Sequence, residues 1–405
     1  MNFQALGLST TIQQALFDAG YRSPTPVQQQ TIPLVLQGKD VMVAAQTGTG
    51  KTASFIAPML DLLGADAELK SNQVKALILV PTRELAVQVH QSIIDYGLHS
   101  VLRAAVIYGG VKINPQMMAL RKGVHMLVAT PGRLLDLYDR NAVKFDHLKI
   151  LVLDEADRML SLGFADEMNR LLDFLPRKRQ TLMFSATLPA EVRQLAGQML
   201  YQAVQITVSP ENITATKVNQ WLVPVDKKRK TALLHSLLLE NSWGQALIFV
   251  NTKKGADRLT QELSINGLKA AAIHGDKSQA VRLRNLRAFK TGDVQILVAT
   301  DVASRGLDIG DLPVVINFDL PKVAEDYVHR IGRTGRANKG GEAISLVSSD
   351  EFDKLRNIEQ MVRQVIRREV VDDFEPSDDV PVSKGVPPLR RAKKPKKKKS
   401  VLGPE

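Results

Sequence analysis

Short apolar runs alternate along this chain with longer segments of helical periodicity, and this alternation limits the fold more than any other sequence feature. The runs are rich in Val, Ile and Leu, as is typical of strands buried on both faces of a parallel sheet. They are VMVAA (41–45), ALILV (76–80), HMLVA (125–129), ILVL (150–153) and TLMF (181–184) in the first half, and ALIFV (246–250), AAAI (270–273), QILVA (295–299), VVINF (314–318) and AISLV (343–347) in the second. The pattern predicts an α/β chain with two mostly parallel sheets flanked by helices.

The domain organisation follows from length and from one break in the pattern. A chain of 405 residues exceeds what a single hydrophobic core usually organises. Apolar periodicity fails in VSPENITATK, where Pro and Asn appear. We therefore expect a first domain over 1–207, a linker over 208–217 and a second domain over 218–369. The similar stretches HMLVATPGRLLDL (125–137) and QILVATDVASRGLDI (295–309) suggest that the two domains are built alike.

Charge is concentrated near the end of the sequence. The formal net charge is +12, of which RRAKKPKKKK (390–399) supplies eight positive charges. The stretch DDFEPSDD (372–379) before it carries five acids, and prolines recur throughout. Segregated charge with few apolar residues predicts disorder over 370–405, as an acidic and then basic tail. We expect the basic part to attract polyanions, and the alternative is a tail that only improves solubility.

Composition excludes several classes of protein. The chain has no cysteine, which rules out disulfides, thiolate nucleophiles and cysteine zinc sites. Its seven histidines form no HExxH pattern, so any metal should be a hard cation bound by oxygen. There is neither a secretory signal nor an apolar run long enough to span a bilayer, and we expect a cytoplasmic protein without membrane contact.

The stretch AAQTGTGKT (44–52) is a candidate phosphate-binding loop. The chain leaves a strand, turns through Gly48 and Gly50 and should enter a helix whose N-terminus faces phosphate oxygens. Lys51 would reach the β- and γ-phosphates, and the Thr52 hydroxyl would help to hold Mg²⁺. Ala45 replaces the first glycine of the usual motif, and the alternative reading is a simple glycine-rich turn.

A pair of carboxylates ends another predicted strand, in ILVLDEAD (150–157). Such a pair is more often a helix N-cap signal. With a phosphate loop in the same domain, Asp154 is suited to orient Mg²⁺ and Glu155 to activate the attacking water. Upstream, Tyr21 offers a flat face to a purine, and the amide of Gln28 can pair with adenine.

Other polar clusters follow the predicted strands, as expected for ligand sites of open α/β sheets. They are PTREL, TPGR and SAT in the first half, and NTKKG, HGD and TDVASRGLDI in the second. Arginines cluster in HRIGRTGR (329–336), which suits a phosphate group. If this cluster serves the same reaction as the phosphate loop, two distant parts of the chain must close on one another.

In their order, these motifs resemble the DEAD-box family of ATP-dependent RNA helicases, and they are most similar to its bacterial RhlE-type branch. The resemblance covers residues 1 to about 365. It implies two tandem RecA-like domains, with ATP and Mg²⁺ as ligands. It also implies an ATP-binding set: Phe3, Tyr21, Gln28, Gln46, Thr47, Gly48, Thr49, Gly50, Lys51, Thr52 and Asp308, the last at the ribose. Catalysis would fall to Lys51, Asp154, Glu155 and two arginine fingers, Arg333 and Arg336, with Thr52 and Asp154 as metal ligands.

The same resemblance implies a set of RNA contacts: Pro81, Thr82, Arg83, Gly109, Gly110, Thr130, Pro131, Gly132, Arg133, Arg282 and Thr300. Hydroxyls, backbone amides and arginines suit phosphates and 2′-hydroxyls and carry little base specificity. For a single position, a capped helix or a solvated arginine remains the alternative. Coupling of the ATP state to RNA binding would involve Ser185, Thr187, Asp157 and His329.

The resemblance thus implies a helicase that binds single-stranded RNA or short duplexes with little sequence specificity and separates them locally as two domains close around ATP. We expect a functional monomer that works in ribosome assembly or RNA turnover. The alternatives are an ATP-gated RNA clamp or chaperone with little unwinding, and a DNA translocase of the same superfamily.

Overall fold

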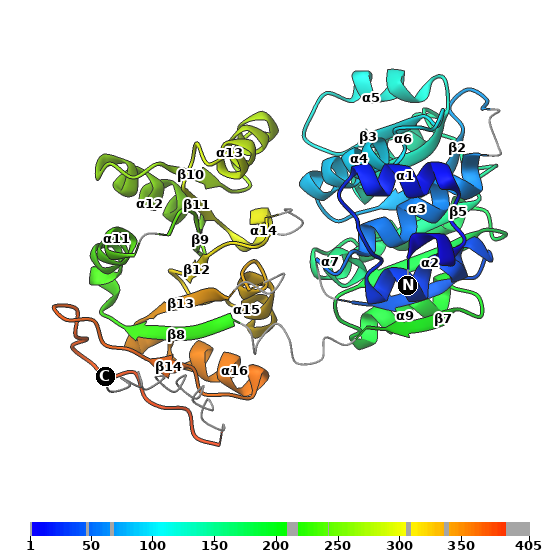
Figure 1. Ribbon diagram of the computed structural model, residues 1–405. Helices are drawn as coiled ribbons and strands as arrows, with labels where there is room; N and C mark the ends of the chain where they lie inside the picture. Colours follow the sequence, from blue (N-terminus) through cyan, green and yellow to red (C-terminus); the bar gives the residue numbers. More distant parts are fainter. Residues whose placement is uncertain are drawn as a thin grey trace, which may run out of the picture. The chain divides into compact units, whose positions relative to one another are not determined.

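Two compact units, each built around one seven-stranded sheet, make up the computed structural model. It describes residues 2–45, 48–64, 69–208, 218–241, 243–304, 309–335 and 340–385. All pairings between the named strands are parallel. The expected two-domain α/β fold is confirmed, and the two domains are described separately below (Figure 1). The predicted linker lies almost entirely in 209–217, outside the described residues.

The first domain has the strand order β3-β4-β2-β5-β6-β1-β7. Its strands are β1 (Val41–Ala44), β2 (Val74–Leu79), β3 (Ala104–Ile107), β4 (Val124–Ala129), β5 (Ile150–Leu153), β6 (Gln180–Ser185) and β7 (Val204–Thr207). Its helices are η1 (Phe3–Leu6), α1 (Thr10–Asp18), α2 (Pro26–Leu36), α3 (Lys51–Gly64), α4 (Arg83–Tyr96), α5 (Ile113–Leu120), α6 (Pro131–Asp139), α7 (Ala156–Ser161), α8 (Ala165–Phe174) and α9 (Ala190–Met199).

The second domain has the order β10-β11-β9-β12-β13-β8-β14. Its strands are β8 (Val218–Pro224), β9 (Ala246–Phe249), β10 (Ala270–Ile273), β11 (Ile296–Ala299), β12 (Val314–Asn317), β13 (Gly341–Val347) and β14 (Arg367–Arg368). Its helices are η2 (Lys227–Arg229), α11 (Lys230–Glu240), α12 (Lys253–Ile265), α13 (Gln279–Thr291), α14 (Asp301–Ser304), α15 (Ala324–Ile331), η3 (Ser349–Glu351) and α16 (Phe352–Val362).

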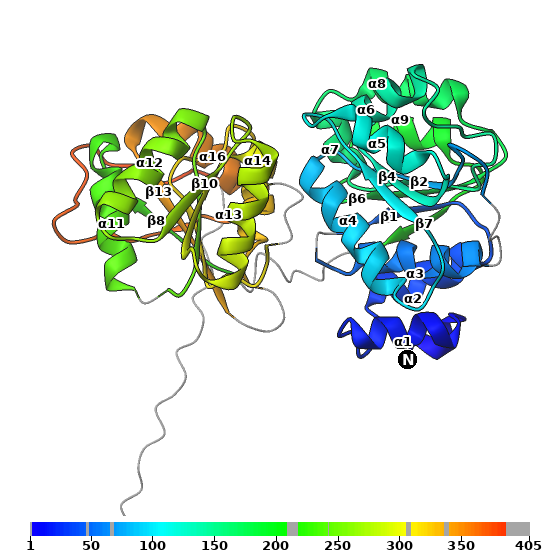
Figure 2. The same cartoon turned by 90° about the horizontal axis from the view of Figure 1, so that it is seen from above.

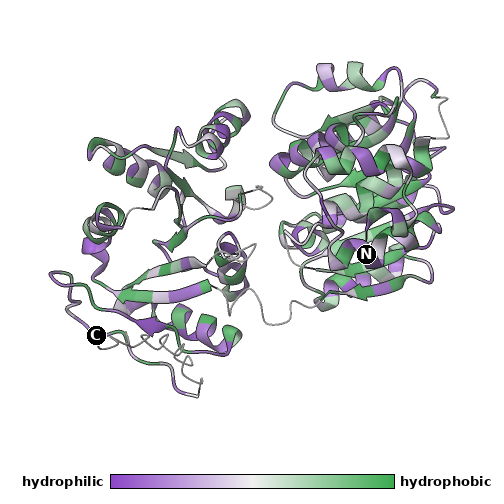
Figure 3. Ribbon diagram, viewed as in Figure 1, coloured by the Kyte–Doolittle hydropathy of each residue, from purple (hydrophilic) through white to green (hydrophobic). Residues whose placement is uncertain are grey.

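Each sheet is buried on both faces, which explains the continuous apolar runs. In the first domain, α1 to α4 cover one face, and the opposite face carries side chains of α6, α8 and α9 (Figures 1 and 2). Successive residues of β2 show the alternation, because Ile78 joins the first core and Leu77 and Leu79 the second. Hydrophobic and hydrophilic residues alternate along many of the helices, whereas the strands of the sheets are mostly hydrophobic (Figure 3). Among the described helices, none has the length and hydrophobicity needed to cross a membrane.

The apolar runs located ten strands, and the structure adds β3, β7, β8 and β14. β3 (AAVI) is apolar throughout, but it is short and lies at the sheet edge, where half-buried residues alternate with buried ones. β7 is the other edge and is mostly exposed. β8 contains Asn219, Gln220 and Pro224, and β14 has only two residues. Polar residues interrupt β7 and β8, and β14 consists of two arginines, so these strands lack a continuous apolar run, whereas β3 was missed although it is one.

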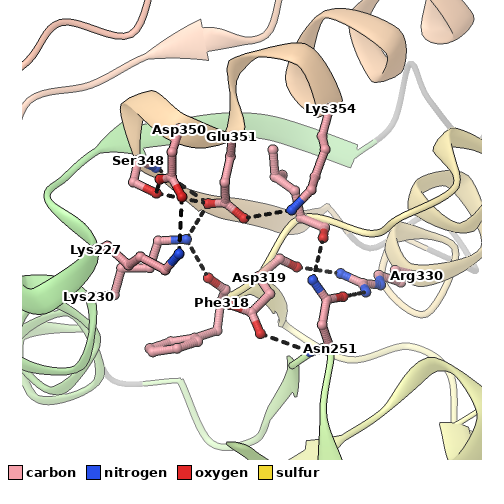
Figure 4. A network of polar contacts seen from close by, with 11 residues as sticks. Lys227, Lys230, Asn251, Phe318, Asp319, Arg330, Ser348, Asp350, Glu351 and Lys354 are labelled. Atoms are coloured by element: carbon pink, nitrogen blue, oxygen red, sulfur yellow. Dashed lines mark hydrogen bonds and ion pairs between the residues drawn. The ribbon is translucent and has the colours of Figure 1, made fainter.

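The two domains share one plan, as the repeated stretch suggested. Reading each sheet from β3 or from β10, the strands occur in the same relative chain order, and the two similar stretches contain β4 and β11, the second strand in each. By this correspondence, β8 matches β1, and Lys230 begins α11 as Lys51 begins α3. The ammonium of Lys230 is bonded to the carboxylate of Glu351 and to the Phe318 carbonyl (Figure 4). Lys230 is the counterpart of Lys51 in the phosphate loop, and in the second domain the carboxylate of Glu351 binds it.

The prediction of disorder from residue 370 is wrong for residues 370–385. This segment, which we call the strap, packs on the second domain, and Val371 and Phe374 lie against its core. Ser377 donates through its amide and hydroxyl to the two oxygens of Asp226, at 2.9 and 2.7 Å. Val380 is buried, and Ser383 donates to buried Glu359. The apolar residues are too widely spaced to form a pattern, and their partners lie far away in the sequence. Residues 386–405 are outside the described part.

The strap should contribute to the stability of the second domain. A chain ending at Glu369 lacks Phe374 and Val380, so the core residues that these side chains cover become exposed to water. We expect this chain to lose on the order of 3 kcal/mol of unfolding free energy. A chain ending at Gly385 should match the full-length protein. Differential scanning calorimetry of the three chains measures this, and equal melting temperatures for both truncations would show that the strap does not stabilise the domain.

Candidate functional site

The phosphate-loop sequence forms the predicted strand–turn–helix. Gly48 and Gly50 have φ values of 81° and 92°, which favour glycine, and α3 begins at Lys51. The Lys51 side chain is buried, and its Nζ donates to the Ala45 carbonyl at 2.7 Å. Thr49 lies in the turn and Thr52 in the first turn of α3, whereas Gln46 and Thr47 lie outside the described residues.

The two carboxylates after β5 differ in their environments. Asp154 is only 3% exposed, and its Oδ1 accepts a bond from the Glu155 amide at 3.0 Å. Burial raises the pKa of Asp154 above its usual range, and the charge of Lys51 opposes that shift. Glu155 has φ 54° and ψ 51°, a left-handed conformation that is uncommon outside glycine. Such strain is found most often at functional sites.

Asp157 is bonded to the Ser-Ala-Thr segment that follows β6. Its Oδ2 accepts bonds from the amide and hydroxyl of Thr187, at 2.9 and 2.8 Å. Ser185 donates to the Thr187 carbonyl at 2.6 Å and accepts a bond from the Asp157 amide at 3.3 Å. These contacts join the ends of two adjacent strands, so a displacement after β5 is transmitted to the loop after β6.

The upstream aromatic residues form one cluster. Tyr21 meets Phe3 and Tyr96 edge to face, with ring centroids 6.4 and 5.7 Å away. Its hydroxyl lies 2.9 Å from the Tyr96 hydroxyl. Tyr96 was missed by the sequence analysis because it is 75 residues away and belongs to an ordinary amphipathic helix. The cluster fixes the ring that the sequence predicts will stack on a purine.

Gln28 connects the upstream segment to the phosphate loop. Its side chain is completely buried, accepting a bond from the Thr25 amide at 2.9 Å and donating to the Gly50 carbonyl at 3.1 Å. A Cβ at Gly50 would lie 2.5 Å from the Gln28 Nε2. The observed role of Gln28 is thus to position the loop, and adenine pairing stays a prediction.

Three predicted RNA-contact segments lie together after β2, β3 and β4. The Arg83 guanidinium covers Gly110, where an added Cβ would fall 2.1 Å from its Nη1. Arg133 donates to the Val111 carbonyl at 2.9 Å. Two helices begin here as well: Thr82 caps α4 by accepting from the Leu85 amide, and Thr130 with Pro131 and Gly132 opens α6. Pro81 precedes Thr82 directly.

The strand order divides this edge of the first domain into two halves. The phosphate loop, the carboxylates and the Ser-Ala-Thr segment follow β1, β5 and β6, which are adjacent. The segments with Arg83, Gly110 and Arg133 follow β2, β3 and β4, which are also adjacent, and the two halves meet where β2 pairs with β5. Parallel pairing therefore puts the nucleotide residues beside the predicted RNA residues.

In the second domain, the predicted RNA and ATP residues lie on or just after β11, α13 and α15. Thr300 follows β11, His329 lies on α15, and Arg333 comes two residues after the end of α15. Arg282 lies in the first turn of α13. Asp308 and Arg336 are outside the described residues. The sequence analysis gave no role to Arg330, although it stands inside HRIGRTGR.

Comparison with known proteins decides the family. Residues 25–195 match the DEAD/DEAH box helicase family, and residues 229–338 match the helicase conserved C-terminal domain. The DEAD-box ATP-dependent RNA helicase CshA of Geobacillus kaustophilus is 43% identical over 366 residues, covering 90% of this chain and 78% of that relative. The chain belongs to the DEAD-box family of ATP-dependent RNA helicases.

Further relatives of this DEAD-box helicase support the assignment. The ATP-dependent RNA helicase CshA of Listeria monocytogenes is 43% identical over 89% of this chain and 69% of its own length. The structure of Saccharomyces cerevisiae Dbp5 bound to RNA and ADP BeF3 is 31% identical, with a TM-score of 0.80 over 92% of this chain and 96% of that one. The relatives are named CshA, so the predicted RhlE-type branch is not supported.

Asp154 should destabilise this DEAD-box helicase when no nucleotide is bound. Its pKa is raised by burial, so at neutral pH the carboxylate is less stable in the folded protein than in the unfolded one. We expect Asp154→Asn to raise the melting temperature at pH 7 and to abolish ATP hydrolysis. Since 1 kcal/mol shifts the melting temperature of such a domain by about 2–4 °C, a rise of a few degrees is measurable by calorimetry.

The difference between Asp154→Asn and wild type should narrow as the pH falls, because the native carboxyl takes up a proton before the unfolded one does. The matched control is Asp157→Asn, whose carboxylate is hydrogen-bonded to Thr187 and should show no gain. Equal melting temperatures for wild type and Asp154→Asn at every pH would contradict the expectation.

Proposed function

We propose that this DEAD-box helicase binds RNA through its sugar-phosphate backbone, opens short duplexes locally and hydrolyses ATP when its two domains close. The observation that carries the proposal is the division of one sheet edge into a nucleotide half and an RNA half. Adjacent sites that share packed strands can favour one another's ligands. Within the nucleotide half, the hydrogen bonds of Asp157 with Ser185 and Thr187 link the carboxylate segment to the segment that the proposal assigns to coupling.

In this proposal, ATP phosphates lie at the N-terminus of α3, where the Lys51 ammonium leaves the Ala45 carbonyl to bind them. Thr52 and Asp154 fit Mg²⁺, which prefers hard oxygen ligands and is usually held by one or two side chains together with phosphates. The raised pKa of buried Asp154 agrees with this, because a cation would offset the cost of its charge. Bound Mg²⁺ would neutralise charge on the phosphates. Glu155 accepts a proton from the attacking water.

The second domain completes the reaction centre on closure. Arg333 and Arg336 stabilise charge on the departing phosphoryl group, an effect worth about 10³–10⁵ in rate in known NTPases. Asp308 binds the ribose, and His329 takes part in coupling. Both ATP and RNA then favour the closed state, and hydrolysis of ATP lets the domains open and release the RNA.

RNA is bound by the helix N-termini and arginines after β2, β3 and β4, together with Arg282 and Thr300. Such groups contact phosphates and 2′-hydroxyls, so the helicase acts on many sequences. We further propose a cytoplasmic enzyme that acts as a monomer in ribosome assembly or RNA turnover. The helicase holds one strand in a bent form that cannot remain in a duplex, and it therefore opens a few base pairs at a time.

The first test is steady-state ATP hydrolysis with no nucleic acid, with single-stranded RNA and with DNA of the same sequence. We expect strong stimulation by RNA alone. Glu155→Gln should lose at least about a hundredfold of that activity, because general-base catalysis contributes about 10²–10⁴ in rate. Equal stimulation by DNA would point to a translocase, and absence of stimulation by RNA would refute the proposal.

The basic tail gives a second test. Its eight positive charges attract RNA by releasing counterions, so deletion of residues 386–405 should raise the RNA concentration for half-maximal ATPase at low salt. If all eight act, the slope of log affinity against log salt becomes shallower by about 5 to 6 for a single strand. A chain with these residues changed to glutamine keeps the length and should behave like the deletion. An unchanged half-saturation concentration would show that the tail does not tether RNA.

A further inference from the structure

Arg330 is the largest fully buried side chain of the described residues, and the proposed function does not use it. It lies on α15, one residue after His329 and three before Arg333. Only 2% of it is exposed. A buried guanidinium stays charged, so its surroundings must supply complete hydrogen bonding.

Five hydrogen bonds satisfy the five N–H groups of Arg330. Nε and Nη2 donate to the two oxygens of Asp301, at 2.6 and 2.7 Å. Nη1 donates to Asn317 Oδ1 at 3.0 Å and to the Asp319 carbonyl at 2.7 Å. Nη2 also donates to Asn251 Oδ1 at 3.4 Å. Figure 4 shows Arg330 beside Asn251 and Asp319.

These partners belong to the carboxyl ends of three adjacent strands. Asn251 comes after β9, Asp301 comes after β11, and Asn317 is the last residue of β12. The ring of Phe249, at the end of β9, lies 4.8 Å from the guanidinium carbon. One side chain therefore fixes three loops and α15 in a single arrangement, and lysine could not replace it because an ammonium cannot make the planar pair with Asp301.

The pair with Asp301 also connects two predicted functional segments. Asp301 directly follows Thr300, a proposed RNA contact, and Arg333, a proposed arginine finger, lies three residues beyond Arg330. Thr300 is thus connected to Arg333 in three steps: the peptide bond to Asp301, the bidentate ion pair of Asp301 with Arg330, and the three residues from Arg330 to Arg333. All of these residues lie in the second domain.

We propose that Arg330 is a positioning residue whose pair with Asp301 makes the Thr300 and Arg333 segments move as one unit. RNA bound at Thr300 then stabilises the placement of Arg333 that ATP also favours. The inference rests on the proposed function, because it takes the roles of Thr300 and Arg333 from it.

The test is the effect of ATP on RNA affinity in Arg330→Lys. RNA binding is measured by fluorescence anisotropy with and without a non-hydrolysable ATP analogue, and the ratio of the two dissociation constants gives the coupling. Such couplings typically amount to about 5- to 150-fold. We expect the ratio to fall from that range to about 1–2 in the variant, while RNA affinity without nucleotide changes by less than about threefold. Asp301→Asn keeps an acceptor and should lower the ratio less.

The matched control is Glu351→Gln, which weakens another buried ion pair of the same domain, that with Lys230. This pair joins neither Thr300 nor Arg333. Both variants should lower the melting temperature, but only Arg330→Lys should lower the coupling ratio. An unchanged ratio in Arg330→Lys, or an equal fall in Glu351→Gln, would overturn the inference.

Arg333→Ala separates this inference from the proposed function. If Arg333→Ala retains RNA-stimulated ATPase, or if the wild type shows no coupling, the proposed function fails. If wild-type coupling is present, Arg333→Ala is inactive and Arg330→Lys keeps the wild-type ratio, only the role of Arg330 fails.

Discussion

Parallel strand pairing is the constraint on which the rest of this protein depends. It brings the carboxyl ends of all strands of a sheet to one edge, so residues far apart in the sequence become neighbours. In the first domain, β2 and β5 pair although their ends are more than 70 residues apart, and this pairing brings the predicted nucleotide residues beside the predicted RNA residues. The same constraint buries the central strands on both faces, which is why they read as plain apolar runs.

Buried charges in the two domains are handled in two ways. Arg330 has a partner for every N–H group, and buried Glu359 accepts bonds from Ile366, Arg368 and Ser383. Such saturated groups hold loops in place. Asp154 is buried with a raised pKa, so its charge is costly in the folded protein, as the proposed role in Mg²⁺ binding would require. Complete hydrogen bonding agrees with the proposed positioning role of Arg330, and a costly buried charge agrees with the proposed ligand site at Asp154.

Much of the fold could be predicted, and the failures have physical reasons. The central strands form apolar runs because both of their faces are buried, whereas polar residues interrupt β7 and β8. The segregated charge and few apolar residues of the strap predict disorder, whereas its order comes from partners such as Asp226 and Glu359, which lie in other elements. Composition describes only the segment itself, whereas the order of a segment also depends on the residues of other elements that it contacts.

The sequence by itself determined the family, the phosphate loop with Lys51, the carboxylates Asp154 and Glu155, and the segments that carry Arg83 and Arg133. It could do so because these groups require particular residues at short spacings. Only the tertiary structure decided that Gln28 positions Gly50, that Tyr96 supports Tyr21, and that Arg330 joins three strand ends. These contacts cannot be predicted from sequence spacing, because the partners are far apart in the sequence. Other side chains that reach the same position with suitable hydrogen-bonding groups could make the same contacts.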